Sequence, residues 1–434
     1  MFYNREIETE QRDNISDIQL KRLKGSLQHA YDNVAMYRQR FDNLGLKPND
    51  INSFEDLKKL PFTVKDDLRD NYPFGLFAVP QSEVVRVHAS SGTTGKPTVV
   101  GYTKADINMW TDVMARLIVA TGVTRDDVAQ VAFGYGLFTG AFGLHNGLEK
   151  VGCMVVPASS GNTEKQIMLM KDFGTTVLIS TPSYALYISE VMENMGIDPR
   201  KDLKLRIGLF GAEACSDKMR EELEARLGIL ATENYGLSEI IGPGVSGECY
   251  LKDGLHINED HFYPEIIDSK TGEVLPIGEA GELVITSLTK EALPIIRYRT
   301  KDITKLIKDK CECGRTSIRM EKVKGRTDDM LIIRGVNVFP SQIETVLLDV
   351  DHIGPHYEII VTNEGWMDKI EVLVEIIDDS LLEKFSMLEQ LQNEIIQDLR
   401  TMLSIDAKVT LVGPNSLKRF QGKAQRVTDL RDNK

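Results

Sequence analysis

The densest group of hydroxyls, glycines and positive charge in the chain is the segment Ser90-Ser-Gly-Thr-Thr-Gly-Lys-Pro97. Glycines let backbone N–H groups turn toward a ligand, hydroxyl groups add further donors, and Lys96 adds a positive charge, a combination that suits a polyphosphate. A Walker loop would have Gly at position 90 and Ser or Thr after the lysine, whereas this chain has Ser90 and Pro97. The segment is therefore not a P-loop NTPase motif. Taken alone, it fits a phosphate-binding loop and a structural turn equally well.

A second glycine cluster, Gly134-Tyr-Gly-Leu-Phe-Thr-Gly140, imitates the dinucleotide fingerprint. Its last glycine comes one place late, and no acidic residue lies about twenty residues farther on to hold a ribose. We therefore exclude NAD binding. The aromatic residues Tyr135, Phe138 and Phe142 could instead form a flat apolar slot for a ring. The alternative, that Phe138 and Phe142 lie four residues apart on the core face of a helix, fits equally well.

The five cysteines are too few and too unevenly spaced for a disulfide framework in a chain of this length. Metal binding or reactive chemistry is therefore considered before crosslinking. Cys153 and Cys215 fall beside apolar runs, and we expect them to be inert packing residues.

The other three cysteines belong to a candidate zinc site. Cys311 and Cys313 are separated by one residue and followed by a glycine, and Cys249 and His256 lie upstream. Three thiolates and one imidazole are ligands that tetrahedral Zn²⁺ prefers. We expect a closed structural site that stabilises a small Gly-rich and Pro-rich region. The spacing matches no standard finger, so scattered reduced cysteines remain the alternative.

The composition excludes several classes of protein. The chain has 434 residues, with 52 Lys and Arg against 65 Asp and Glu, which gives a formal net charge of −13. An acidic surface repels a phosphate backbone, so we expect no nucleic-acid partner. No run reaches the ~18 apolar residues of a membrane helix, and the opening residues lack the apolar core of a secretion signal. We therefore expect a cytoplasmic protein without a membrane partner.

The elements that must position the candidate residues follow from the hydrophobic pattern. Short apolar runs at 128–133, 151–156, 176–180 and 205–210 alternate with polar stretches of helical length, such as 163–173 and 217–227. This alternation predicts an α/β fold with buried strands. Between 247 and 304 the composition changes to Gly, Pro and β-branched residues, which predicts a small β subdomain over about 247–324. A strand at 370–377 and a helix at about 383–403 predict a separate α+β domain.

Five motifs at large spacings occur together in this chain. They are 90–97, Asn234-Tyr-Gly-Leu-Ser-Glu239, Arg297-Tyr-Arg-Thr-Lys-Asp302, Gly325-Arg-Thr-Asp-Asp329 and Arg419-Phe-Gln-Gly-Lys423. One of them could arise by chance, but five in this order resemble the acyl-adenylate-forming superfamily of acyl-CoA synthetases, luciferases and peptide-synthetase adenylation domains. The short length and the segment 60–77 are similar to the phenylacetate-coenzyme A ligases, and the resemblance runs nearly end to end.

The resemblance implies two domains. A large N-terminal AMP-binding body over 1–327 would contain β-sheets flanked by helices and the small β subdomain. A small α+β domain over 328–434 would move between two half-reactions, and Asp328 matches the hinge position.

The resemblance also implies the chemistry and the cofactors ATP, Mg²⁺ and coenzyme A. The carboxylate of an aryl acid attacks the α-phosphate of ATP and expels pyrophosphate, and the CoA thiolate then displaces AMP from the acyl-adenylate. The first step brings two anions together, so cations and oriented donors must stabilise the transition state. Lys423 matches the catalytic lysine and Glu239 the Mg²⁺ ligand. The family often has proline before Arg419, where this chain has Lys418.

For the nucleotide, Asp302 is expected to accept both ribose hydroxyls, because a carboxylate has two acceptor oxygens. Tyr235 would stack on adenine, and Arg326 would lie near the ribose and phosphate. The nucleotide-binding set implied by the resemblance is Ser90, Ser91, Gly92, Thr93, Thr94, Lys96, Gly211, Ala212, Glu213, Asn234, Tyr235, Gly236, Asp302 and Arg326.

The other substrates have their own candidate residues. Tyr135, Phe138 and Ala212 are expected to form the acid pocket, and the resemblance favours an aryl acetate over a long fatty acid. Arg334 and Gly335 are candidates for CoA binding, since an arginine suits the CoA phosphates. Some relatives in the family carry a cysteine and histidine cluster like that of Cys249, His256, Cys311 and Cys313.

Two other interpretations stay open. An adenylating enzyme could pass a heteroaryl acid such as indoleacetate to CoA or to a carrier protein. A nucleotide-binding regulator without catalysis is the third interpretation, and its expected sign is the loss of Lys423, Glu239 or Asp302, all of which are present. Family members are often dimers, so the resemblance leaves a homodimer open.

Overall fold

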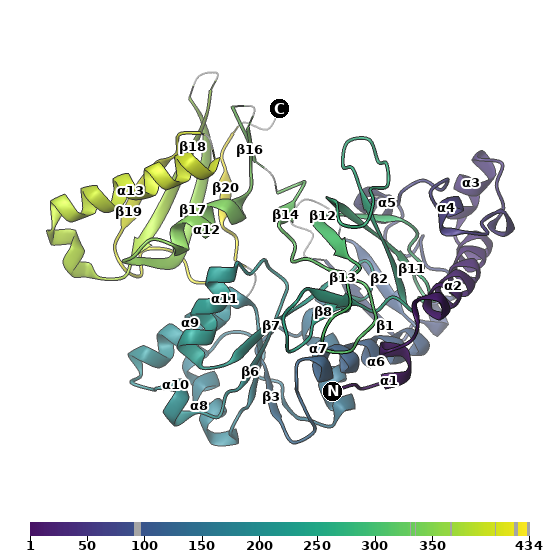
Figure 1. Ribbon diagram of the computed structural model, residues 1–434, viewed down its shortest axis with the longest axis horizontal. Coiled ribbons are helices and arrows are strands. Elements are labelled where there is room, and N and C mark those ends of the chain that lie inside the picture. Colours follow the sequence, from purple (N-terminus) through teal and green to yellow (C-terminus); the bar gives the residue numbers. More distant parts are fainter. Residues whose placement is uncertain are drawn as a thin grey trace.

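The computed structural model describes residues 1–90, 97–329, 331–334, 336–364, 367–403, 405–420 and 424–431. Figure 1 shows a large body with a smaller C-terminal part, in yellow and light green, beside it. None of the helices in the described ranges combines the length and the apolar character that a bilayer crossing requires.

Helices and a β-hairpin open the chain. The helices are α1 (Arg5–Glu8), α2 (Arg12–Asn33), α3 (Ala35–Asn43), α4 (Phe54–Leu57) and α5 (Lys65–Asp70), followed by the hairpin β1 (Arg86–Ala89) and β2 (Val99–Tyr102) and by α6 (Lys104–Ala120). A capping box begins α6: the Thr103 hydroxyl accepts from the Asp106 N–H at 3.0 Å, and the Asp106 carboxylate accepts from the Thr103 N–H at 2.9 Å. The hairpin therefore leads directly into a well-capped core helix.

A parallel sheet forms the centre of the body. Its order is β4 (Met154–Val156), β3 (Val128–Val131), β5 (Val177–Ser180), β6 (Ile207–Phe210) and β7 (Leu230–Leu237), and the helices between the strands are α7 (Gly140–Val151), α8 (Thr163–Phe173), α9 (Pro182–Asn194), α10 (Pro199–Asp202) and α11 (Asp217–Leu227). Every residue of β5 and β6 is buried, as strands covered on both faces require. The predicted α/β fold is confirmed, and the helices at 163–173 and 217–227 match their predicted bounds.

The sheet continues as antiparallel strands. They are β8 (Gly242–Glu248), β9 (Leu255–Ile257), β10 (Phe262–Ile267), β11 (Ala280–Ser287), β12 (Tyr298–Ile307), β13 (Arg319–Met320) and β14 (Gly325–Arg326). Within the described ranges the hydrogen-bonded path runs β10-β11-β12-β13-β9-β8-β7 and on through the parallel strands. The region 247–324 is thus β-rich as predicted, but its strands continue the central sheet because β8 pairs with both β7 and β9.

The C-terminal part is an α+β unit with its own core. Its elements are β15 (Leu331–Ile333), β16 (Val336–Val338), α12 (Pro340–Leu348), β17 (Ile353–Glu364), β18 (Met367–Ile376), α13 (Phe385–Leu403), β19 (Lys408–Val412) and β20 (Val427–Asp429). The sheet order is β19-β18-β17-β20. Ile343, Val372 and Ile395, from α12, β18 and α13, are fully buried in this core. The predicted α+β character of this part is confirmed.

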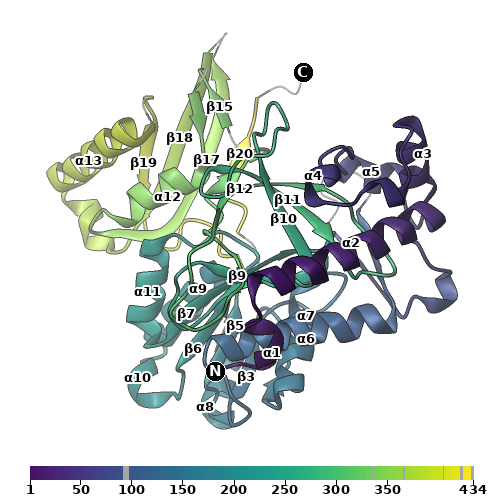
Figure 2. The ribbon, with the colours of Figure 1, turned by 45° about the vertical axis from the view of Figure 1, so that its right-hand side comes forward.

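The C-terminal part packs against α9 and α11 of the body, and Figure 2 shows α12 beside α11. Polar contacts cross this junction, among them His356 Nε2, which lies 2.8 Å from Glu190 Oε1, and Lys218 Nζ, which lies 3.2 Å from Asp349 Oδ1. The boundary at 327/328 stays a prediction.

Candidate active site and metal centre

The candidate nucleotide-binding residues gather at the carboxyl ends of parallel strands. The loop 211–213 follows β6, and Asn234 and Tyr235 lie on the neighbouring β7. Asn234 Nδ2 donates to the carbonyl oxygen of Phe210 at 2.8 Å. A Cβ on Gly211 would lie 2.8 Å from the Asn234 carbonyl oxygen, so this position requires glycine. Open α/β sheets bind ligands outside these strand ends.

Asp302 is a buried carboxylate with two side-chain partners. The Tyr235 hydroxyl donates to Oδ2 at 2.6 Å, and Arg326 Nη1 donates to Oδ1 at 2.9 Å. Burial raises the pKa of Asp302, although the charge of Arg326 and the hydrogen bond from Tyr235 oppose this. A carboxylate has about four lone-pair sites, so each oxygen can accept one more donor. The expected contact with a ribose diol therefore fits, but it would share the carboxylate with Tyr235 and Arg326.

Arg326 also connects this carboxylate to the predicted hinge residue. Its Nε and Nη2 donate to the two oxygens of Asp328 at 2.8 and 3.0 Å. Burial alone would lower the pKa of Arg326, but the hydrogen bond to Asp328 and the charges of Asp302 and Asp328 raise it overall. One guanidinium thus contacts both residues.

Ser90 closes the base of the candidate phosphate loop. Its N–H donates to the Thr98 carbonyl oxygen at 3.0 Å, and its hydroxyl accepts from the Thr98 N–H at 3.0 Å. The other predicted residues of this loop, Ser91, Gly92, Thr93, Thr94 and Lys96, lie outside the described residues.

A cavity of about 390 Å³ opens beside the strand ends. Phe138, Leu144, Ser160, Thr181, Gly211, Ala212, Asn234 and Gly236 are among the residues that line it. Ala212 has a φ of +70°, and this left-handed conformation turns the chain just after β6. The cavity thus contacts candidate residues for the nucleotide and, through Phe138 and Ala212, for the acid.

Tyr135 is not among the residues that line this cavity. Its hydroxyl lies 2.9 Å from His145 Nδ1, and its ring packs edge-on against Phe142 with centroids 5.3 Å apart. Since α7 begins only at Gly140, Phe138 lies in the loop before the helix, and the interpretation of Phe138 and Phe142 as one helix face is wrong. Glycines at 134, 136 and 140 favour a loop there. The assignment of Tyr135 to the acid pocket stays a prediction.

Glu239, the candidate Mg²⁺ ligand, lies in the turn between β7 and β8 and is 8% exposed. Burial and the negative charge of Glu239 raise the pKa of the Tyr298 hydroxyl well above its usual value. Behind the turn, Lys290 Nζ donates to the Ile240 carbonyl oxygen at 2.8 Å. Burial lowers the pKa of Lys290 to about 8, while the charges of Asp106 and Glu239 oppose this effect. The turn that carries Glu239 is therefore held from the inside of the protein.

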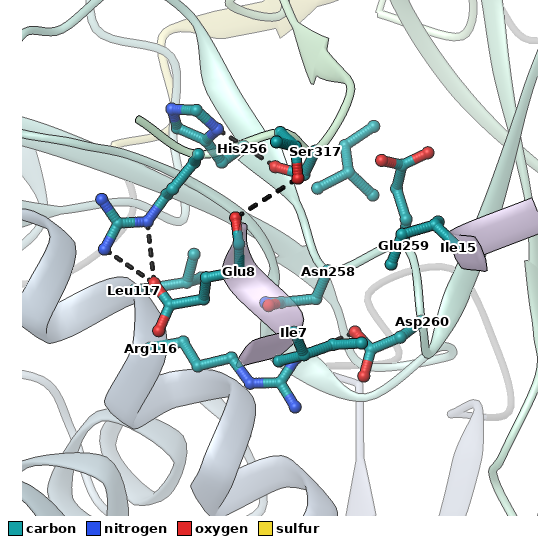
Figure 3. A pocket seen from close by; sticks show the side chains of 13 residues that line it. Ile7, Glu8, Ile15, Arg116, Leu117, His256, Asn258, Glu259, Asp260 and Ser317 are labelled. Carbon is teal, nitrogen blue, oxygen red and sulfur yellow. Dashed lines mark hydrogen bonds and ion pairs between the residues drawn. The ribbon is translucent and has the colours of Figure 1, made fainter. Parts of the chain in front are cut away.

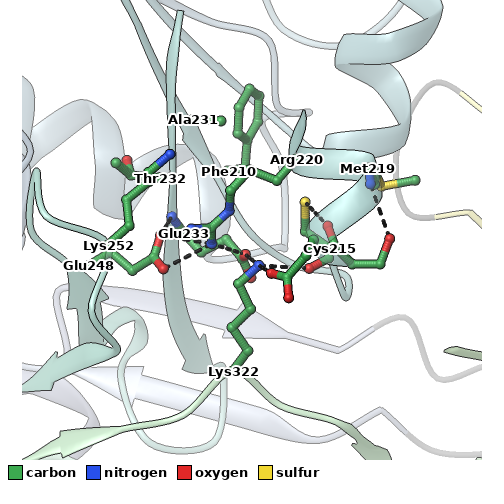
Figure 4. A network of polar contacts seen from close by, with 12 residues as sticks. Phe210, Cys215, Met219, Arg220, Ala231, Thr232, Glu233, Glu248, Lys252 and Lys322 are labelled. Atoms are coloured by element: carbon green, nitrogen blue, oxygen red, sulfur yellow. Dashed lines mark hydrogen bonds and ion pairs between the residues drawn. The ribbon is translucent and has the colours of Figure 1, made fainter. Parts of the chain in front are cut away.

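A network of charged residues supports β7 where the nucleotide-binding segment begins. Figure 4 shows Arg220 between Glu233 and Glu248, with Lys322 also approaching Glu233. Arg220 Nη2 donates to Glu248 Oε1 at 2.9 Å, and Lys322 Nζ lies 2.9 Å from Glu233 Oε1. The Glu233 N–H donates to Glu248 Oε2 at 2.8 Å. Because Glu233 directly precedes Asn234, the network holds the register of this strand.

Other predicted residues lie on both sides of the domain junction. Glu213 Oε1 accepts from the Ser183 N–H at 2.6 Å, at the N-terminus of α9. In the C-terminal part, Arg419 donates to Glu375 Oε2 at 2.8 Å. Arg334 has a φ of +52°, and its Nε donates to the Asp368 carbonyl oxygen at 3.0 Å. The catalytic candidate Lys423 and the CoA candidate Gly335 lie outside the described residues.

The structure brings the four candidate zinc ligands together. The donor atoms of Cys249, His256, Cys311 and Cys313 all lie within 4.8 Å of one another, and all four residues are buried. The Sγ atoms of Cys249 and Cys311 are 3.8 Å apart, and Cys313 Sγ lies 3.4 Å from His256 Nε2. Tetrahedral zinc with Zn–S bonds of about 2.3 Å would place sulfur atoms about 3.8 Å apart. The donor set and its spacing therefore fit zinc.

Residues around this cluster orient its ligands. His256 Nδ1 lies 3.1 Å from the Ser317 hydroxyl, which leaves Nε2 to face Cys313. Arg315 Nη2 pairs with Glu8 of α1 at 2.7 Å, and Figure 3 shows Glu8 close to His256 and Ser317. Hydrogen bonds from Cys249 and His256 hold the pKa of Cys313 well below its usual value. Through Arg315, the N-terminal helix α1 is thus connected to the segment that carries Cys313.

Several residues at the site were missed by sequence reasoning. Glu375 interrupts the apolar run of β18 with a carboxylate that is 3% exposed. Because a buried carboxylate needs a positively charged or hydrogen-bonding partner, a Glu in such a run indicates that one lies nearby. Leu144, Ser160 and Thr181 line the cavity from three separate segments and carry no such signal.

Family models match two segments of the chain. The model described as "AMP-binding enzyme" matches residues 43–289, and the model described as "AMP-binding enzyme C-terminal domain" matches residues 335–431.

Characterised relatives cover nearly the whole chain. The chain is 53% identical over 426 residues to a phenylacetate-coenzyme A ligase of Pseudomonas putida, covering 98% of this chain and 96% of the relative. It is 49% identical over 427 residues to a phenylacetate-coenzyme A ligase of Escherichia coli (strain K12), covering 98% and 97%.

Solved structures give the same result for the fold. A 2-hydroxyisobutyryl-CoA ligase in the postadenylation state is 28% identical, with a TM-score of 0.93, covering 99% of this chain and 92% of that one. In its thioesterification state, with CoA, that ligase has a TM-score of 0.74 at 29% identity, covering 99% and 93%.

Proposed function

Because the chain belongs to the AMP-binding enzyme family, and within it to the phenylacetate-coenzyme A ligases, we propose that it joins an aryl acetate, with phenylacetate as the first choice, to coenzyme A with formation of AMP and pyrophosphate. The observation that carries the proposal is the 53% identity to a phenylacetate-coenzyme A ligase over 98% of this chain. A similarity of this extent covers both domains, and the motif residues Glu239, Asp302 and Lys423 are all present.

The first half-reaction is an attack of the substrate carboxylate on the α-phosphate of ATP. A new P–O bond to the carboxylate forms, and the bond between the α-phosphate and pyrophosphate breaks. Lys423 would bridge the two anions, and the loop at 90–97 would hold the phosphates. Asp302 would hold the ribose, in keeping with its position beside Tyr235 and Arg326. Mg²⁺, when bound, would neutralise phosphate charge, and Glu239 offers it a hard oxygen ligand.

In the second half-reaction the thiolate of CoA attacks the acyl carbon, the carbon–oxygen bond to AMP breaks, and AMP leaves with that oxygen. The thiol proton goes to solvent. We assign the change between the two half-reactions to a movement of residues 328–434 about Asp328. The higher TM-score with the postadenylation state than with the thioesterification state of one ligase supports two arrangements of such a chain. Arg334 is the candidate contact for the CoA phosphates.

The cavity of about 390 Å³ is our candidate for the acid pocket. Phe138, Leu144 and Ala212 give it apolar walls, which suit an aromatic ring. The candidate nucleotide-binding residues Gly211 and Asn234 also line this cavity. An acid bound there would therefore lie close to ATP, as its attack on the α-phosphate requires.

We also propose that Cys249, His256, Cys311 and Cys313 hold a structural Zn²⁺. Their burial and mutual distances support this assignment. The ion would tie β8, β9 and the segment before β13 together, with no role in the reaction. The cytoplasmic location and the homodimer stay predictions.

The proposed activity is tested by measuring AMP formation from ATP with a panel of arylacetates, with and without CoA. Phenylacetate should give AMP that depends on CoA in sustained turnover, together with an equal amount of thioester. AMP formation independent of CoA would refute the second half-reaction. Exclusive use of a heteroaryl acid such as indoleacetate would correct the substrate while leaving the reaction in place.

A further inference from the structure

His88 of β1 is a buried polar residue to which neither proposed half-reaction assigns a role. Its side chain is 1% exposed. Its Nδ1 lies 3.0 Å from the carbonyl oxygen of Leu137, which also accepts from the Ala89 N–H at 3.0 Å. Since a carbonyl oxygen can only accept, Nδ1 must carry the proton and donate it to Leu137. Strand β1 therefore holds the loop before α7 by two hydrogen bonds to one carbonyl group.

The other ring nitrogen of His88 has no such partner. Nε2 is buried and forms no hydrogen bond within the described residues. Around the ring lie Tyr102, Trp110 and Phe142, with centroids 5.5, 6.0 and 5.6 Å away. Burial lowers the pKa of His88, which disfavours the charged form of the ring. A leucine or phenylalanine would fill this aromatic cage without an unpaired nitrogen, which means that packing alone does not account for histidine here.

The loop that His88 holds carries a wall of the acid cavity. Phe138 follows Leu137 directly and lines the cavity. The side chains of Leu137 and Phe138 are 62% and 54% exposed, so side-chain packing contributes little to their position. The Leu137 carbonyl group is therefore a main attachment point between this part of the loop and the body.

His88 also contacts the candidate aromatic slot directly. Phe142 packs against His88 on one side and against Tyr135 on the other. Two residues farther along the chain, Ser90 forms the base of the candidate phosphate loop. One short strand thus touches the loop of the acid cavity and leads into the loop for ATP.

We propose that His88 is a positioning residue for acid selectivity: through its Nδ1–H bond to Leu137 it fixes the loop that carries Phe138 and so sets the shape of the cavity wall against the aryl ring. This inference rests on the proposed function, because it assigns the cavity to the acid substrate. His88 itself touches no reacting atom.

The test compares three variants of the full-length protein. His88→Leu removes the donor and fills the cage, whereas His88→Asn keeps an N–H donor close to the place of Nδ1. The matched control is His261→Leu, because His261 is also buried, with Nδ1 2.7 Å from the Thr289 hydroxyl, but the segment around Thr289 contributes no residue to the cavity lining. Kinetics are measured with the acid that the wild type adenylates best, so failure of the phenylacetate assignment is seen separately in the wild type.

His88→Leu should raise the KM for the acid by about tenfold and reduce the preference for an aryl over an alkyl acid, with a much smaller change in the KM for ATP. His88→Asn should restore most of the KM and the preference. Hydrogen exchange in residues 134–139 should increase in His88→Leu and not in His88→Asn. The proposal is overturned if His88→Leu changes the KM for the acid and the KM for ATP equally. It is also overturned if His88→Asn restores neither the KM for the acid nor the aryl preference, or if hydrogen exchange in residues 134–139 is unchanged in His88→Leu.

Discussion

Glu213 and Ala424 lie on opposite sides of the domain junction, and the backbone N–H of Ala424 donates to Glu213 Oε2 at 3.0 Å. The other carboxylate oxygen accepts from the N–H of Ser183 at the start of α9. Ala424 follows the catalytic candidate Lys423 in the chain. One carboxylate of the body thus holds both a helix N-terminus and the C-terminal segment next to the candidate lysine.

Replacing Glu213 should therefore affect the first half-reaction most. Hydrogen bonds to charged groups contribute about 1.5–3 kcal/mol, so Glu213→Ala should slow adenylation by about tenfold to a hundredfold. Acid-dependent exchange of pyrophosphate into ATP measures this step. The control is Glu221→Ala, whose side chain is 68% exposed on α11. Thioesterification of a supplied acyl-adenylate should change little, and an equal loss in both steps would contradict the docking role.

Lys423→Ala should slow adenylation far more than thioesterification of a supplied acyl-adenylate. The reason is electrostatic: only the first step brings a carboxylate and a phosphate together, so only that step needs a cation between them. Rapid-quench measurements of each half-reaction on its own show whether adenylation loses more rate than thioesterification. Lys418→Ala, five residues earlier, is the matched control. Equal losses in the two half-reactions would remove the assigned role of Lys423.

Asp302→Asn should raise the KM for ATP with little effect on the KM for the acid. The variant removes the charge that a ribose diol would meet and leaves Arg326 without its buried partner. A loss of about 1–3 kcal/mol in the binding free energy of ATP corresponds to a rise of about fivefold to a hundredfold in its KM. Tyr235→Phe removes only one donor to Asp302 and should have a smaller effect. A greater effect on the acid would place Asp302 elsewhere in the site.

Local patterns in the sequence predicted the buried strands and the helix at 163–173, because burial and helical periodicity act over a few neighbouring residues. Residue type, together with the spacing of Cys311 and Cys313, also selected four candidate metal ligands whose donor atoms the structure brings together. The pairing of Asp302 with Tyr235 could not be predicted, since it joins residues 67 positions apart through the packing of β7 and β12. The same holds for the continuation of 247–324 into the central sheet, which depends on strand pairing.

Zinc removal should destabilise the body without a specific effect on either half-reaction. Protein purified without added metal should contain about one zinc atom per chain, and Cys311→Ser should reduce both the zinc content and the Tm. Cys153→Ser is the control, because Cys153 is buried far from this cluster in sequence and burial raises its pKa to about 11. Metal-free protein with an unchanged Tm would refute the structural zinc.

Stability at the domain junction should depend on pH through Glu344 of α12. Burial raises the pKa of Glu344 from 4.5 to about 7, the charge of Arg426 opposes this, and the charge of Glu213 adds to it. The Tyr357 hydroxyl donates to Glu344 Oε1 at 3.3 Å. A pKa that is raised on folding means that the folded state holds the proton more tightly. The contribution of Glu344 to stability is therefore fully present below about pH 4.5 and is lost as the pH rises through about 7.

Glu344→Gln, which stays neutral, should become more stable relative to the wild type as the pH rises. The raised pKa of Glu344 corresponds to a change of at most about 3 kcal/mol, between pH 5 and pH 8, in the difference in unfolding free energy between the variant and the wild type. Urea unfolding at several pH values in this range measures the difference in the free energy of unfolding. Glu389→Gln, on the exposed face of α13, should show no such trend. If the difference between Glu344→Gln and the wild type is the same at every pH, Glu344 does not titrate in this range and the buried carboxylate must be stabilised by Arg426 instead.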